Sequence, residues 1–81
     1  MSRWEKLLAR LYSLPNDMRF EELRKILLAY GYTESIPRDG SSHQTFRKKG
    51  RMPITIPVHG RIKMDYVEMV RDMVEEEGGL K

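Results

Sequence analysis

The sequence predicts a single α+β domain in which a three-stranded antiparallel sheet is packed by helices, in the order α-α-β-β-β-α. Its 81 residues are too few for two ordinary domains. Apolar residues recur at spacings of three and four before residue 31 and after residue 63, which is the helical period. Between them lie short segments separated by Asp39-Gly40 and Lys49-Gly50, pairs that favour tight turns between antiparallel strands.

Two helices are expected before the sheet and one after it. The first ends at Leu14-Pro15, because proline cannot continue a helix. The second ends at Gly31, which can adopt the left-handed conformation of a helix C-terminus. The third begins at Met64, and residues 75–79 should form a frayed, solvated end. The apolar stripes of the three helices are predicted to form the core: Trp4, Leu7, Leu8, Leu11, Tyr12, Phe20, Leu23, Ile26, Leu27, Tyr30, Tyr66, Val67, Val70, Met73 and Val74.

Three strands are expected, at residues 32–37, 42–47 and 52–57. Prolines bracket the last of them and cannot donate to a ladder, so this strand should be short and lie at an edge. The first hairpin leaves two possibilities open. A two-residue Asp39-Gly40 loop would turn Ile36 outward, so either a three-residue loop or a bulge near residues 41–42 is expected.

Side-chain alternation predicts which residues face the helices. Phe46, Ile54 and Ile56 should point toward them, which leaves the alternate residues on the open face. For the second and third strands to present their apolar residues to the same side, Phe46 must pair with Ile54. That pairing requires a loop with an odd number of residues, Lys49-Gly50-Arg51, with its glycine in a left-handed conformation.

Charge is concentrated in residues 38–63. This stretch holds seven of the fifteen Lys and Arg residues, one acidic residue and both histidines, and its net charge is +6, against −4 for residues 64–81. A basic centre predicts an anionic partner, most simply a phosphate backbone. The simpler alternative is a solvated basic surface.

The two histidines are the candidate catalytic residues. The predicted register sets His43 opposite Pro57 on the open face. If the strand continues, His59 becomes the diagonal neighbour of His43, at roughly 7 to 8 Å between backbones. Two imidazoles at that spacing can flank one phosphate.

An imidazole can exchange a proton near neutral pH, and RNA carries its own nucleophile, the 2′-hydroxyl. His43 can take that proton while neighbouring cations meet the charge that develops on the phosphate. The chemistry requires neither a metal nor a cofactor. The residues expected to bind RNA are Ser41, Ser42, Arg47, Lys48, Lys49, Arg51, Arg61 and Lys63.

Other functions find less support. With 40% hydrophobic and 33% charged residues, the composition is that of a globular domain. The chain has no cysteine, which fits a reducing cytosol, and two histidines with only Asp39 nearby fall short of a zinc ligand set. A Gly-x-Ser-x-Gly elbow and a glycine-rich phosphate loop are both missing. No signal peptide or membrane span is apparent, so a cytoplasmic protein without a membrane partner is expected.

Three sequence elements together resemble the HicA toxins, over roughly residues 18–74. They are Phe20-Glu21-Glu22-Leu23 with Leu27 and Gly31-Tyr32, then Gly40-Ser41-Ser42-His43 with Phe46-Arg47, then Ile54-Thr55-Ile56-Pro57-Val58-His59-Gly60. The resemblance implies a fold like a double-stranded-RNA-binding domain, metal-independent cleavage of messenger RNA, and growth arrest. It also implies neutralisation by a HicB-type antitoxin, and it assigns the catalytic role to His43.

The chain departs from the family pattern in two places. Residues 18–77 correspond to the family core, whereas residues 1–17 hold an additional helix that can bind the antitoxin, extend the core or mediate self-association. Two serines also stand before His43 where many members have one. Two other functions remain open: a noncatalytic module that binds RNA by its shape, and a protein-interaction domain whose basic face docks an acidic partner.

Overall fold

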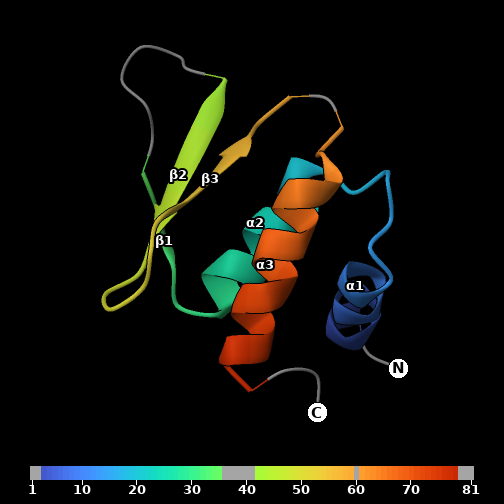
Figure 1. The fold of residues 1–81 in the computed structure, drawn as a ribbon, viewed down its shortest axis with the longest axis horizontal. Helices are drawn as coiled ribbons and strands as arrows, with labels where there is room; N and C mark the ends of the chain where they lie inside the picture. The colour runs from blue at the N-terminus through green and yellow to red at the C-terminus, as the bar shows by residue number, and fades with distance from the viewer. Residues whose placement is uncertain (1–2, 36–41, 60, 79–81) are drawn as a thin grey trace.

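The computed structural model describes residues 3–35, 42–59 and 61–78. Its elements are α1 (Arg3–Tyr12), α2 (Phe20–Ala29), β1 (Thr33–Ser35), β2 (His43–Arg47), β3 (Ile54–Pro57) and α3 (Met64–Glu76). The predicted α+β class and the order α-α-β-β-β-α are confirmed. Figure 1 shows three layers, with the sheet on one side, α2 and α3 in the middle, and α1 against the face of these helices that lies away from the sheet.

The sheet is antiparallel with the strand order β1-β2-β3, so β2 is its central strand. Phe46 pairs with Ile54, as predicted. The connecting turn is closed by a 3.0 Å hydrogen bond from the Arg51 N–H to the Lys48 carbonyl, and Gly50 has a φ of +82°. The odd loop with a left-handed glycine is therefore confirmed. The two possibilities for the first hairpin concern residues 36–41, which lie outside the described part of the chain.

The strands are shorter than predicted. The third begins at Ile54 rather than at residue 52, and the first begins at Thr33. Pro53 lies directly before β3, and Pro57 is its last residue. Because neither proline has an N–H, neither can donate to a ladder, and such residues are tolerated in a strand at the edge of a sheet, as predicted.

Each helix and the two strands β2 and β3 contribute to one core. Its buried side chains are Leu8, Leu11, Met18, Leu23, Ile26, Leu27, Tyr32, Phe46, Ile54, Ile56, Ile62, Val67, Val70, Met73 and Val74. Trp4 was predicted inside, but it is 38% exposed and packs beside Tyr30, with ring centroids 6.1 Å apart. Met18 and Ile62 lie between helices and strands, where no periodicity marks them. The Ile62 N–H donates to the Met18 carbonyl at 3.3 Å, which joins the two connections.

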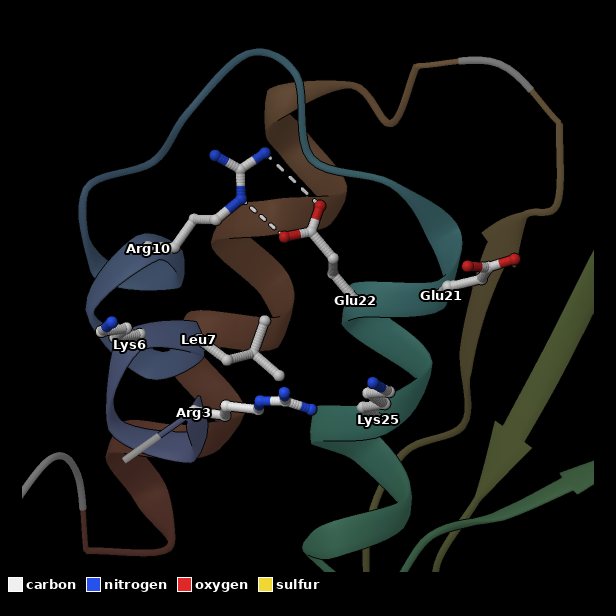
Figure 2. A pocket seen from close by; sticks show the side chains of 7 residues that line it. All are labelled: Arg3, Lys6, Leu7, Arg10, Glu21, Glu22 and Lys25. Atoms are coloured by element: carbon white, nitrogen blue, oxygen red, sulfur yellow. Dashed lines mark hydrogen bonds and ion pairs between the residues drawn. The ribbon is translucent and has the colours of Figure 1, made fainter. Parts of the chain in front are cut away.

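The additional helix α1 extends this core, because Leu8 and Leu11 are buried against the rest of the domain. Arg10 then fastens the helix to α2. Its guanidinium donates to the Glu22 carboxylate at 2.6 Å, as Figure 2 shows, and to the Asp17 carboxylate at 3.0 Å. Glu22 also accepts the Arg19 N–H at 3.0 Å, a donor that the beginning of α2 leaves without a helical partner. One carboxylate thus stabilises both the start of α2 and its contact with α1.

The end of α2 has the predicted left-handed glycine. Gly31 has a φ of +92°, its N–H donates to the Leu28 carbonyl, and the Tyr32 N–H donates to the Leu27 carbonyl, both at 3.1 Å. These two bonds form a Schellman motif, which satisfies carbonyls that the helix leaves unpaired. The motif turns the chain directly into β1.

The end predicted at residues 75–79 is solvated, since residues 75–78 are exposed, but the prediction that it frays is wrong for the residues that the structure describes. Helix α3 continues to Glu76, and the carboxylates of Glu76 and Glu77 bind cations of the β2–β3 turn. The prediction failed because these partners lie more than twenty residues away in the sequence, so no local pattern reveals them.

Replacing Gly31 by alanine should lower the free energy of unfolding by about 1–2 kcal/mol, the usual cost of a left-handed conformation for a residue with a Cβ atom. An added Cβ would lie 3.5 Å from Lys48 Cε, an ordinary contact, so backbone strain is the cause. Urea unfolding of the purified variant measures the loss. Gly31→Asn is the matched control and should lose less, because asparagine tolerates this conformation. Equal stability of the wild type and Gly31→Ala would contradict the assignment.

Candidate functional site

The outer face of the sheet, which is turned away from the helices, carries the predicted site residues of β2. Phe46 is buried on the helix side, so alternation places His43, Thr45 and Arg47 on the outer face. Thr45 pairs with Thr55, and their hydroxyl oxygens are 3.0 Å apart. The predicted faces of β2 and β3 therefore agree with the structure.

His43 is the first residue of β2 and pairs with Pro57, as predicted. The Ser42 hydroxyl oxygen lies 3.2 Å from its Nδ1 atom. The Val58 N–H donates to the Ser42 carbonyl at 2.7 Å, so pairing continues one residue beyond the strand ends. The backbone of Ser42, the residue before His43, is thus held by the residue that follows β3. Ser41, which was also predicted to bind RNA, lies outside the described residues.

A polar network behind His43 was not anticipated from the sequence. Arg24 of α2 donates to both carboxylate oxygens of Glu34 in β1, each at 2.7 Å, and the Gln44 amide donates to the same carboxylate at 2.7 Å. The hydrogen bond from Arg24 lowers the pKa of Glu34 below its ordinary value, and the bond from Gln44 adds to this effect. The network ties the residue next to His43 to α2. The sequence feature that could have revealed this network is Gln44, because a side-chain amide on the inner face of the sheet needs a polar partner.

His59 does not share the face of His43. It lies two residues past the end of β3 and lines a hollow of about 700 Å³ at the beginning of α2. The other lining residues are Arg19, Phe20, Glu21, Arg24, Lys25 and Val58, and His43 is not among them. The predicted diagonal pairing assumed that β3 continues. Instead the chain bends at residues 58–59 and crosses toward α3, which carries His59 around to α2.

Two of the predicted RNA-binding cations have structural partners. Lys48 donates to the Tyr30 carbonyl at the end of α2 at 2.6 Å and to the Glu77 carboxylate at 3.1 Å. Arg51 pairs with Glu76 and lies 2.9 Å from Glu77. The carboxylates of the α3 end therefore compensate these charges. Lys48 and Arg51 fasten the turn between β2 and β3 to the ends of α2 and α3.

The other predicted cations are exposed: Arg47, Lys49, Arg61 and Lys63. None of them forms an ion pair with a carboxylate in residues 3–35, 42–59 or 61–78. Arg47 shares the outer face with His43, whereas Lys49 lies in the turn beyond the far end of β2. Lys63 occupies the N-cap position directly before α3, and Figure 1 shows that the start of α3 lies at the same end of the molecule as the start of β2. Uncompensated positive charge therefore lies at the far end of the outer face of β2 and, through Lys63, at the end of the molecule where His43 stands.

Within the described residues, no cluster of three or more histidine, aspartate or glutamate side chains could hold a metal ion. In the same part of the chain, none of the helices has the length and apolar character needed to cross a membrane. Comparison with protein-family models, curated proteins and solved structures gave no match. The site is therefore interpreted from its own geometry.

The ion pairs of Glu77 should make the stability depend on pH. The hydrogen bond from Lys48 lowers the pKa of Glu77 below its ordinary value of 4.5. A lowered pKa in the folded state means a stabilisation that is complete above pH 4.5 and lost as the pH falls through the folded-state value. The wild type should therefore be more stable than Glu77→Gln at pH 7, and the difference should shrink between pH 4.5 and pH 3.

Urea midpoints of both proteins at pH 7, 5, 4 and 3 measure this effect. Glu75→Gln is the matched control, because it removes an exposed carboxylate of the same helix that pairs with neither Lys48 nor Arg51. The difference in stability between Glu75→Gln and the wild type should vary less with pH. A constant difference between the wild type and Glu77→Gln over this range would disprove the contribution of Glu77.

Proposed function

We propose that this chain is an endoribonuclease of the toxin type that cuts messenger RNA without a metal ion, with His43 as the general base. The observation that carries the proposal is the setting of His43. An imidazole stands on an exposed sheet face, its residue pairs with Pro57 of β3, and a hydroxyl lies 3.2 Å from Nδ1. Exposed cations on the same face and at the same end of the molecule favour a phosphate-bearing substrate.

The Ser42 hydroxyl can orient the imidazole for this role. When Nδ1–H donates to the Ser42 oxygen, the neutral ring carries its lone pair on Nε2, which is the form that a general base requires. His43 then removes the proton of the 2′-hydroxyl. The 2′-oxygen bonds to the adjacent phosphorus, the bond from phosphorus to the 5′-oxygen breaks, and this leaving oxygen takes up a proton from water. His43 then returns its proton to the solvent. The products are a 2′,3′-cyclic phosphate end and a 5′-hydroxyl end.

Arg47 supports this chemistry from the same face at the other end of β2, because its guanidinium can bind a neighbouring phosphate of the RNA and hold the backbone across the face. Arg61 and Lys63 add positive charge near the start of α3. Lys48 and Arg51 contribute indirectly in this proposal. Their bonds to the α2 and α3 ends hold the hairpin that presents His43.

The biological setting follows from the resemblance to the HicA toxins. In this proposal the enzyme arrests growth by destroying messenger RNA in the cytoplasm, and a HicB-type antitoxin neutralises it. The sequence elements that carry the resemblance include both Ser42 and His43, the pair on which the proposed chemistry depends.

The purified chain should cleave RNA in the presence of EDTA, and His43→Ala should lower the rate by about 10² to 10⁴-fold, the usual contribution of a general base. Gel electrophoresis of an end-labelled transcript measures the rate, and circular dichroism checks the fold. Arg71→Gln, which changes a half-buried cation of α3 that is paired with Asp72, is the control and should cleave like the wild type. Cleavage by His43→Ala at the wild-type rate would refute His43 as the base. RNA binding by the wild type without any product would instead indicate a noncatalytic module.

His59 should act as a phosphate ligand rather than as the acid, because it lines the hollow at α2 and not the face of His43. His59→Ala should therefore raise KM several-fold and change kcat much less than His43→Ala does. Initial rates over a range of RNA concentrations separate the two parameters. A fall in kcat as large as that of His43→Ala, with KM unchanged, would show that His59 is the acid.

A further inference from the structure

We propose that the RNA backbone extends from the hollow of His59 across α2 and onto α1, along a cationic band formed by Arg19, Lys25, Lys6 and Arg3. This inference rests on the proposed function, since it extends the substrate contact of the same enzyme. It assigns a role in substrate binding to α1, the helix that precedes the part of the chain resembling the HicA toxins.

A second hollow, of about 360 Å³, lies between α1 and α2. Figure 2 shows its arrangement. Arg3 extends from α1 toward α2, where Lys25 lies, and the half-buried side chain of Leu7 reaches between the two helices. Arg10 and Glu22 bind each other at one end of the hollow. Lys6, also on α1, completes the cationic side of the opening.

The two hollows adjoin each other. Glu21 and Lys25, one helical turn apart on α2, line both the hollow of His59 and the hollow at α1. A chain that leaves the first hollow therefore meets Lys25 before it reaches Arg3 and Lys6. Arg19 stands at the start of α2, on the side of His59.

The charges that line the two hollows do not balance. The carboxylate of Glu22 forms an ion pair with Arg10, and the guanidinium of Arg24 forms an ion pair with Glu34. Among the described residues, none of the four band cations forms an ion pair, and Glu21 is the one remaining carboxylate of the two linings. Like charges that two helices bring together repel one another, and an anion that lies between them relieves this repulsion.

The extent of the band points to a polyanion. A single phosphate or nucleotide could occupy one hollow, but cations that continue from one hollow into the next match a chain with one charge at every residue. The apolar side chains of the lining are Leu7 in one hollow and Phe20 and Val58 in the other. Unpaired cations that recur along both hollows match the regular phosphates of a single-stranded RNA backbone, and the Phe20 ring offers one surface for base stacking.

The test measures binding of a fluorescent 20-nucleotide RNA that carries 2′-O-methyl groups, which the enzyme cannot cleave. Anisotropy titrations of the wild type, Arg3→Gln, Lys25→Gln and the double variant are made at several salt concentrations. Each lost phosphate contact should lower the slope of log affinity against log salt by about 0.7, which corresponds to about fivefold at 0.1 M salt. The double variant should therefore bind about 25-fold more weakly than the wild type. Arg71→Gln, whose charge is paired with Asp72 on α3, should bind like the wild type.

Three outcomes distinguish this inference from the proposed function. Unchanged affinity and slope in the double variant, from a wild type that binds and cleaves RNA, would overturn the band alone. If RNA binding depends on Arg3 and Lys25 but the wild type cleaves no RNA, the result would support the cationic band and refute the proposed endoribonuclease activity. If the double variant loses affinity for poly-glutamate but not for RNA, the surface docks an acidic protein and the band as an RNA path is wrong. Circular dichroism of each variant confirms that α1 remains folded.

Discussion

Burial of Phe46 is the constraint on which the rest of the structure depends. This ring lies in the central strand, is fully buried, and packs beside Phe20 of α2 with centroids 6.0 Å apart. Because side chains of a strand alternate, fixing Phe46 inward fixes His43 and Arg47 outward and Gln44 inward. A slip of one residue would bury the imidazole and expose the core. The position of the candidate base is therefore a consequence of hydrophobic burial, and the network of Gln44, Glu34 and Arg24 reinforces it.

The features that the sequence predicted are those that depend on neighbouring residues. Helical periodicity, strand alternation and the left-handed conformations of Gly31 and Gly50 each depend on residues close together in the sequence. They therefore predict the order of the elements and the register of the strands. Features that depend on distant residues were missed. The pairing of Lys48 with Glu77 spans 29 residues, and the direction of His59 depends on where the chain bends after β3. A composition that is basic in the centre and acidic at the end predicted neither contact.

The basic residues of this small domain serve two purposes. Arg10, Arg24, Lys48 and Arg51 bind carboxylates and join one element to another, so their charges are compensated. The cations around His43 and along the outer side of α1 and α2 have no such partners among the described residues. Net charge alone does not separate the two groups, because each cation contributes equally to it. The three-dimensional arrangement of the carboxylates separates them, and it leaves the available positive charge on surfaces that surround the candidate site.

The two prolines of β3 also bear on how copies of this chain behave when they are crowded together. A sheet edge with free amide groups can pair with the edge of another molecule and begin aggregation. Pro53 and Pro57 remove the amide hydrogen at both ends of this edge. The β3 edge thus offers few donors to a neighbour. The central strand can be strongly apolar on one side while this edge resists pairing with another molecule into fibres.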